Sequence, residues 1–157
     1  MRSENSDLIS ARRCRTPKGM SDKNAILAAN AAFYAAFATG STDDMSMVWA
    51  EDDNVSCIHP GWPAIVGRLA VLGSWRDILN TSARPHITCH DPYAIVTGDS
   101  GYVLCIELMG TVAFAASNHF RLIDGVWRLS HHQATPIATN AGLEGDDPPP
   151  PPSVKIH

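Results

Sequence analysis

The chain has 157 residues, of which 45% are hydrophobic and 18% are charged, and its formal net charge at pH 7 is −4. This length and composition indicate a single folded domain. We expect neither a membrane nor nucleic acid as a partner, because no apolar run approaches the roughly 20 residues that cross a bilayer and because phosphate binding requires clustered Lys and Arg.

The two ends of the chain differ from its middle in composition. Residues 1–19 hold five of the 12 basic residues and two of the 16 acidic ones, and they lack the apolar stretch of a secretory signal. We interpret them as a basic, disordered extension, with a targeting segment as the alternative. Residues 138–157 include five consecutive prolines, which favour a solvated polyproline II tail over a docking motif. The domain is therefore expected to occupy residues 20–137.

Apolar residues recur at helical spacing in three segments, which predicts helices over residues 22–39, 43–49 and 68–80. The first segment is rich in alanine and gives one broad apolar face. Ser21 or Asp22 can cap its start, and Gly40 ends it. Ser41 or Thr42 can cap the second helix.

From residue 86 the apolar period changes to the alternation of β-strands. Four long strands are predicted over residues 86–97, 101–109, 112–123 and 126–135, after a short strand over residues 54–58. Short turn sequences separate them, and Asp124-Gly125 is the strongest hairpin sequence among these turns. Helices followed by antiparallel strands predict an α+β fold, in which the helices pack on one face of a curved sheet.

Alternation along the strands also assigns each side chain to a face of the sheet. Glu107 falls on an otherwise apolar face, and Asn118 and Phe120 are expected to face inward. In the last strand, placing the one arginine in solvent turns His131 toward the packed side and His132 away from it. These assignments assume regular strands, because a β-bulge would invert every position after it.

Neither the histidines nor the cysteines form a recognisable metal motif. Adjacent strand residues face opposite ways, so His131 and His132 are poorly placed to bind one ion. A site built from His59, His131 and Glu107 would be the alternative, but no ligand spacing supports it. The four cysteines lack C-x-x-C spacing, which indicates free thiols in a reducing cytoplasm. We therefore predict a cytoplasmic protein without a metal or other cofactor.

Two stretches carry a resemblance to a known family: CIHPGWPAIVGRLAVLGSWRDIL over residues 57–79 and SNHFRLIDGVWRLSHHQATP over residues 117–136. Together with the order of the elements, they resemble the SnoaL-like branch of the nuclear transport factor 2-like superfamily. The resemblance implies a cone-shaped α+β roll, in which a curved antiparallel sheet wraps a long N-terminal helix and leaves a pocket at the open end. It also implies a homodimer formed through the outer face of the sheet.

Comparison with ketosteroid isomerase, a member of this superfamily, implies positions for a site. The aspartate base of the isomerase lies directly before a turn rich in proline and glycine, where this chain has His59. The isomerase's oxyanion-binding acid lies in an Asp-His-Phe triplet, which is matched here by Asn118 and the two residues after it. The oxyanion-binding tyrosine falls near Phe33 or Tyr34. This chain therefore differs from the isomerase at both acidic positions.

These positions give candidate roles. His59 is a candidate general base or acid, because an imidazole titrates near neutral pH; the alternative is a hydrogen bond within a turn. Asn118 and Tyr34 are candidates for stabilising an oxyanion, and a buried structural amide is the alternative for Asn118. The residues expected to bind a small hydrophobic ligand are Trp62, Phe33, Cys57, Trp75, Glu107, Phe120 and His131.

Two functions from different classes follow from this reading. The first is a proton-transfer enzyme of isomerase, cyclase or dehydratase type that acts on a small hydrophobic carbonyl compound. The second is a non-catalytic dimeric module that binds a small ligand or serves in assembly. Because the superfamily includes both kinds of protein, the family resemblance alone does not choose between them.

Overall fold

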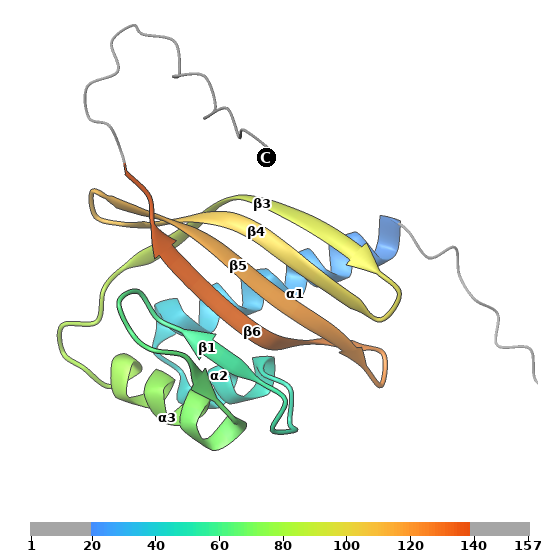
Figure 1. Ribbon diagram of the computed structural model, residues 1–157, viewed down its shortest axis with the longest axis horizontal. Helices are drawn as coiled ribbons and strands as arrows, with labels where there is room; N and C mark the ends of the chain where they lie inside the picture. The colour runs from blue at the N-terminus through green and yellow to red at the C-terminus, as the bar shows by residue number, and fades with distance from the viewer. Residues whose placement is uncertain (1–19, 139–157) are drawn as a thin grey trace, which may run out of the picture.

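A computed structural model describes residues 20–138 (Figure 1). Its elements are α1 (Met20–Thr39), α2 (Thr42–Val48), β1 (Ser56–Ile58), β2 (Ile65–Val66), α3 (Arg68–Leu79), β3 (Ile87–Thr97), β4 (Ser100–Met109), β5 (Val112–Ile123) and β6 (Val126–Pro136). The six strands form one sheet in the order β2-β1-β6-β5-β4-β3. Figure 1 shows α1 lying across one face of the long strands, with α2 and α3 beside β1. The predicted α+β fold is confirmed, while the expected extension over residues 1–19 and the tail after residue 138 lie outside the described residues.

The long strands β3 to β6 pair antiparallel with their neighbours in the chain. β1 instead pairs parallel with β6, so that Ser56 lies opposite His131 and Ile58 lies opposite Gln133. The sequence did not predict β2, because its two residues are too few to show an alternation. This strand forms through its antiparallel pairing with β1.

The first helix packs one face against the sheet. Its fully buried positions include Ile26, Phe33 and Phe37, whereas most of its exposed positions are alanines. The helix begins at Met20, so the predicted caps Ser21 and Asp22 lie within its first turn instead of before it. The predicted start of this helix was therefore too late, as predicted helix starts often are by a residue or two.

The junction between α1 and α2 follows the predicted chemistry. Gly40 has a φ of +72°, which ends α1, and its N–H donates to the carbonyl of Ala36 at 3.0 Å. The hydroxyl oxygen of Ser41 caps α2 by accepting from the N–H of Asp44 at 3.1 Å. Within residues 20–138, no helix is both long enough and apolar enough to cross a membrane.

A β-bulge in β6 changes which side chains face the helices. The pairing of β5 with β6 shifts register between His119 and Phe120, and Ser130 is the extra residue. Beyond this bulge, His132 is 3% exposed on the inner face, and His131 lies on the outer face. The prediction that His131 faces the packed side and His132 faces away is therefore wrong, because the alternation rule was carried through a bulge.

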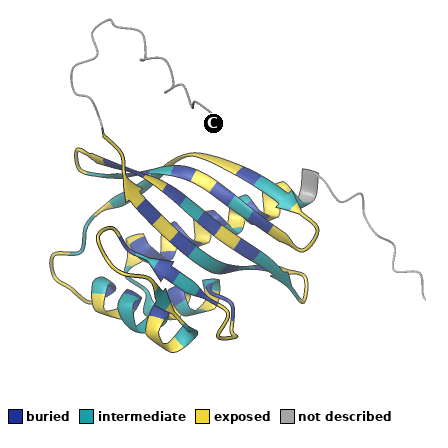
Figure 2. Ribbon diagram, viewed as in Figure 1, coloured by how far each residue is buried: buried dark blue, intermediate teal, exposed yellow. Residues whose placement is uncertain are grey.

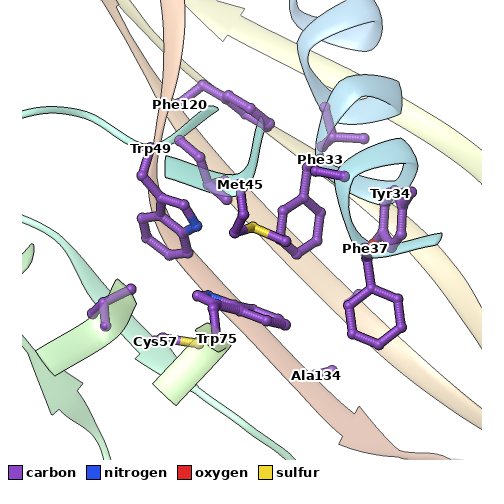
Figure 3. Close-up of a cluster of buried hydrophobic side chains, with 14 of the residues drawn as sticks. Phe33, Tyr34, Phe37, Met45, Trp49, Cys57, Trp75, Phe120 and Ala134 are labelled. Atoms are coloured by element: carbon purple, nitrogen blue, oxygen red, sulfur yellow. The ribbon is translucent and has the colours of Figure 1, made fainter. Parts of the chain in front are cut away.

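The hydrophobic core fills the space between the helices and the inner face of the sheet. Figure 2 shows buried and exposed residues alternating along β4 and β5, as expected for strands with one covered face. Glu107, Asn118 and Phe120 are all buried on the inner face, which confirms the predicted faces of these two strands. Figure 3 shows Phe33 and Phe37 on α1 close to Trp75 on α3.

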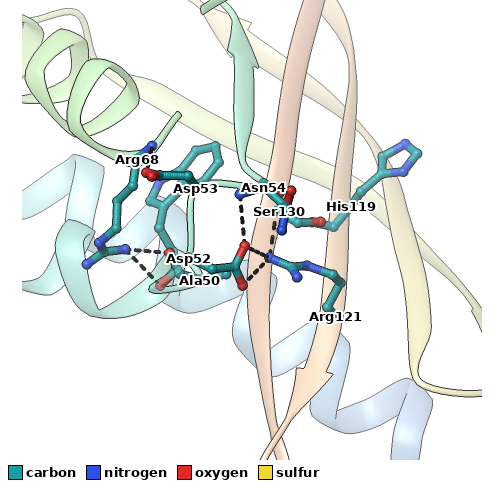
Figure 4. Close-up of polar contacts among 9 residues, drawn as sticks. Ala50, Asp52, Asp53, Asn54, Arg68, His119, Arg121 and Ser130 are labelled. Carbon is teal, nitrogen blue, oxygen red and sulfur yellow. Dashed lines mark hydrogen bonds and ion pairs between the residues drawn. The ribbon is translucent and has the colours of Figure 1, made fainter. Parts of the chain in front are cut away.

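Two arginines hold the segment that joins α2 to α3 (Figure 4). The guanidinium of Arg68 donates to the carbonyl of Ala50 at 2.6 Å, which fixes the start of α3 against the end of α2. Arg121 on β5 donates to both carboxylate oxygens of Asp52 at 2.9 Å. These contacts secure both ends of the β1–β2 region, and this region carries His59.

Candidate functional site

A cavity of about 330 Å³ lies between α1, α3 and the inner face of the sheet. Its aromatic walls are formed by Phe33, Tyr34, Phe37, Trp62, Trp75 and Phe114. Three further polar side chains reach it from different strands or turns: His59, Glu107 and His132. A larger hollow of about 640 Å³ lies between α1, α2 and the start of β6, but six of its 14 lining residues are alanine and its one aromatic residue is Trp127. We therefore place the candidate site in the smaller, aromatic cavity.

A tight turn brings His59 and Trp62 to the cavity. The N–H of Trp62 donates to the carbonyl of His59 at 2.9 Å, and Pro60 and Gly61 occupy the two central positions. Gly61 has a φ of +78°, as the third position of a type II turn requires. The two rings meet edge to face with centroids 5.1 Å apart. His59 is 4% exposed and Trp62 is 49% exposed, so the turn places an imidazole inside the cavity and an indole at its mouth.

The hydrogen bonds of His59 determine which ring nitrogen carries its hydrogen. The hydroxyl of Ser74 donates to the carbonyl of Val71 at 2.7 Å, and its oxygen lies 3.0 Å from Nε2 of His59. Because the only hydroxyl hydrogen is already donated, Nε2–H is the donor to Ser74 and Nδ1 is left as an acceptor. Burial lowers the pKa of His59 to about 4, so the ring is neutral at pH 7.

A buried polar network forms the wall of the cavity on the sheet side. Tyr34 donates to Oε1 of Glu107 at 2.8 Å. The amide nitrogen of Asn118 donates to the hydroxyl of Tyr34 at 3.0 Å and to Oδ1 of Asn30 at 2.8 Å. Its amide oxygen lies 2.6 Å from Nδ1 of His132. Such a network fixes the orientation of each member, because a buried polar group left unpaired is costly.

Burial favours the neutral form of the titratable groups in this wall. Desolvation raises the pKa of Glu107, and the hydrogen bond from Tyr34 opposes this only in part. Desolvation and the nearby Glu107 raise the pKa of Tyr34 far above its ordinary value, so this group stays a phenol. Desolvation lowers the pKa of His132 to about 3. The cavity therefore presents two neutral imidazoles at pH 7.

The structure brings most of the predicted site residues together. The predicted residues that line the cavity are His59, Tyr34, Trp62, Phe33, Trp75 and Glu107. Asn118 lies behind this wall and reaches the cavity only through its bonds to Tyr34 and His132. Asn118 is thus placed to position other side chains.

Three other predicted ligand-binding residues do not line the cavity. Cys57 is buried beneath His59, with its sulfur 3.7 Å from Nε2, and Phe120 is buried in the core. His131 lies on the outer face, where its Nδ1 is 2.8 Å from the hydroxyl of Ser56. Among the residues that the structure describes, no group of three or more His, Cys, Asp or Glu side chains could hold a metal ion.

Sequence reasoning missed His132, which has the most completely buried imidazole of the site. The sequence did indicate an inward histidine at this place, because, of two adjacent residues in a strand, one faces inward. The deciding information was the position of the bulge, and nothing in the sequence of β6 announces it. Phe37 and Phe114 were also missed, although both lie on faces that were predicted to be apolar.

Comparison with known proteins identifies the family. The model of the SnoaL-like domain matches residues 26–139. A candidate calcium/calmodulin-dependent protein kinase type II association domain from Thiobacillus denitrificans is 34% identical, with a TM-score of 0.66, over 71% of this chain and 94% of its own. A candidate dehydratase of the NTF2-like family from Streptomyces avermitilis is 30% identical, with a TM-score of 0.69, over 76% of this chain and 99% of its own.

A third similar structure shows the fold alone. It is a protein of unknown function with a cystatin-like fold from Nostoc punctiforme, which is 16% identical with a TM-score of 0.64 and covers 76% of this chain and 93% of its own. Comparison with curated proteins gave no match. The extent of the family match and the two relatives at 30% identity or more agree with the fold. The chain therefore belongs to the SnoaL-like domain family, within the NTF2-like, cystatin-like fold.

Proposed function

We propose that the protein is an acid–base enzyme that moves a proton on a small, uncharged and mainly apolar carbonyl compound. The observation that carries this proposal is an aromatic cavity into which His59, Glu107 and His132 all project. Among the described residues, the lining contains no Lys or Arg to neutralise an anionic substrate. Moving an anion from water into an aromatic cavity that offers no cation is costly, so an uncharged substrate fits the site best.

His59 is proposed as the group that takes the proton. Its ring is neutral at pH 7, because burial lowers its pKa to about 4, and its acceptor nitrogen is Nδ1, which has the Cys57 sulfur 3.8 Å away. Removing a proton from the carbon next to the carbonyl group would give an enolate and a protonated His59. A positioned base of this kind typically contributes a factor of about 10² to 10⁴ in rate.

Tyr34 is proposed to stabilise the charge that develops on the enolate oxygen. The hydroxyl group of Tyr34 lies at the cavity wall and donates its hydrogen to Glu107 in this structure. With substrate bound, it would donate that hydrogen to the enolate oxygen instead. Asn118 donates to the oxygen of the same hydroxyl and so holds the phenol in place. In this proposal Tyr34 contacts the substrate and Asn118 positions Tyr34.

The fate of the enolate separates the possible reactions. Return of the proton from His59 to another carbon would give an isomer, and departure of a β-hydroxyl group together with a proton would give an alkene and water. The 30% identity with the candidate dehydratase from Streptomyces avermitilis supports the second course. Neither course requires a cofactor.

The test is exchange of the α-protons of 2-tetralone in D₂O, followed by NMR, together with turnover of a panel of β-hydroxy ketones. The wild-type protein should accelerate exchange, and His59→Gln should lose about 100-fold or more of that rate. His119→Gln, on the exposed outer face, is the matched control and should retain it. Equal rates for wild type and His59→Gln would rule out His59 as the base.

The second candidate is a non-catalytic homodimer that binds a small hydrophobic ligand or serves in assembly. The 34% identity with the candidate association domain from Thiobacillus denitrificans supports it. We place the dimer interface on the outer face of the sheet, where Leu104 and Tyr93 are exposed. A monomeric mass in solution at micromolar concentration would count against this interface. Ligand binding without any proton exchange would favour the module over the enzyme.

A further inference from the structure

Two polar atoms on the sheet side of the cavity face each other across a gap. Nε2 of His132 and Oε1 of Glu107 are 4.0 Å apart, and both side chains line the cavity. This distance is too long for a direct hydrogen bond. The two side chains are 3% and 4% exposed, so bulk water is largely kept away from them. One oxygen atom of a ligand could contact both groups at normal hydrogen-bond distance.

The hydrogen bonds of Asn118 show what the His132 side of this gap requires. Both amide hydrogens of Asn118 are used, in bonds to Asn30 and Tyr34, so its oxygen must face His132. Nδ1 of His132 therefore carries the ring hydrogen and donates it to Asn118. A neutral imidazole has one such hydrogen, and Nε2 is consequently an acceptor with no hydrogen of its own. Burial keeps the ring neutral at pH 7, since it lowers the pKa to about 3.

Glu107 can act as a hydrogen-bond donor or as an acceptor, depending on its protonation state. A neutral carboxyl group, which burial favours by raising the pKa, can donate its hydrogen to a ligand oxygen. An ionised carboxylate would accept a hydrogen instead. An ammonium ion could bridge the two groups only if Glu107 were ionised, and burial opposes that state.

A hydroxyl group satisfies both sides and a carbonyl oxygen does not. The hydroxyl can donate its hydrogen to Nε2 of His132 while its oxygen accepts a hydrogen carried by Oε1 of Glu107, which keeps a lone pair for the hydrogen bond from Tyr34. A carbonyl oxygen would place its lone pairs against the lone pair of Nε2. The rings of Phe33 and Trp75 flank His132, with centroids 5.1 and 5.5 Å from the imidazole, so a flat apolar body can pack beside the bound hydroxyl.

We propose that Nε2 of His132 and the carboxyl group of Glu107 form a binding subsite for the hydroxyl group of an uncharged, flat ligand. The subsite narrows the substrate class to hydroxy compounds, and its use in catalysis rests on the proposed function. In a dehydration, Glu107 would protonate the departing hydroxyl group, which leaves as water. Binding of the hydroxyl group does not depend on that reaction and can be measured separately.

The test compares 2-naphthol with its methyl ether, in which a methyl group replaces the donor hydrogen, on the full chain by calorimetry or ligand fluorescence. The wild-type protein should bind 2-naphthol about tenfold more tightly, because the ether cannot donate to Nε2. His132→Phe should abolish this preference. His131→Phe is the matched control, since it alters the neighbouring residue on the opposite face, and it should retain the preference.

Glu107→Gln separates this subsite from the proposed chemistry. The amide still offers a donor and an acceptor, so the preference for 2-naphthol should stay within about threefold of wild type, while the variant can no longer supply a proton. A retained preference in a protein without any turnover would leave the subsite standing and count against the proposed enzyme. Proton exchange by a wild-type protein that shows no preference for 2-naphthol would support the proposed enzyme and count against the subsite.

A measurement that needs no ligand keeps the proposal testable if His132→Phe does not fold. Long-range ¹H–¹⁵N NMR spectra of the wild-type protein at pH 7 should show His132 as the neutral Nδ1–H tautomer. An Nε2–H tautomer would overturn the proposal. Equal affinity for the two probes, binding of neither, or a preference that survives in His132→Phe would also overturn it.

Discussion

Asn118 and His132 lie on adjacent strands, and the amide oxygen of Asn118 accepts the Nδ1 hydrogen of His132 across 2.6 Å. The same amide donates to Tyr34 and Asn30, so one side chain joins β6, β5 and α1. All of these contacts are buried, and none can be replaced by bulk water. The orientation of the cavity wall therefore depends on a residue that does not itself line the cavity.

Replacing this amide should destabilise the fold. Asn118→Leu keeps a similar volume but leaves Nδ1 of His132 and Oδ1 of Asn30 without partners, at an expected cost of about 2–3 kcal/mol in the free energy of unfolding. Urea denaturation monitored by circular dichroism measures this cost. Ser117→Ala changes the neighbouring, half-buried position on the outer side of β5 and should cost less than about 0.5 kcal/mol. Similar losses in the two variants would contradict the assigned role.

Deleting Ser130 should leave the faces of the end of β6 unchanged. Ser130 is the extra residue of the bulge, so without it His131 still pairs with His119 and His132 with Asn118. His132 should therefore stay inward, and the preference for 2-naphthol should be retained. Thermal melting and probe binding test this outcome, with Ser130→Ala, which retains the extra residue, as the control. Loss of the preference in the deletion variant alone would show that the bulge itself holds His132 in place.

Two glycines should respond to alanine with opposite signs. Gly61→Ala places a side chain at a φ of +78° in open space, so the cost of about 1 kcal/mol comes from the backbone alone. Gly73 lies inside α3 at an ordinary φ with room for a methyl group, and Gly73→Ala should stabilise the protein by about 0.5–1 kcal/mol. Urea midpoints of the two variants measure both changes. A stabilising Gly61→Ala would show that the turn does not require a positive φ.

Stability should fall as the pH is lowered below about 6.5. The pKa of His59 is about 4 and that of His132 about 3 in the folded protein, against an ordinary value of 6.5. In this window the unfolded chain binds protons that the folded chain does not, so unfolding becomes easier by about 1.4 kcal/mol per pH unit for each histidine. The effect should extend down to about pH 4, where His59 begins to titrate in the folded state.

The raised pKa of Glu107 acts in the opposite direction, because a carboxyl group that stays protonated when folded favours the folded state at low pH. The net slope is therefore expected to be smaller than the sum for two histidines. Urea titrations between pH 5 and 6 measure it, and His59→Gln should reduce the slope by about 1 kcal/mol per pH unit. A stability that does not change across this range would contradict the buried, neutral state of both rings.

The sequence was sufficient to predict elements whose pattern is local. The helix over residues 68–79 and the strand over residues 112–123 were located almost to the residue, because apolar period and turn sequences define them. Local patterns could not predict which of His131 and His132 faces inward, because the bulge at Ser130 depends on how β5 and β6 pair. The polar wall was equally inaccessible, because its bond between Asn30 and Asn118 joins residues 88 positions apart.

The parallel pairing of β1 with β6 also sets an order of events during synthesis. Within the described residues, the partners of β1 in the sheet are β6 and the two-residue β2, and Ile58 pairs with Gln133. His59 directly follows this strand, so its place in the cavity depends on a segment that leaves the ribosome more than 70 residues later. The aromatic residues of α1 and α3 are thus made well before the sheet that covers them. The candidate site can therefore be completed only after β6 has been synthesised.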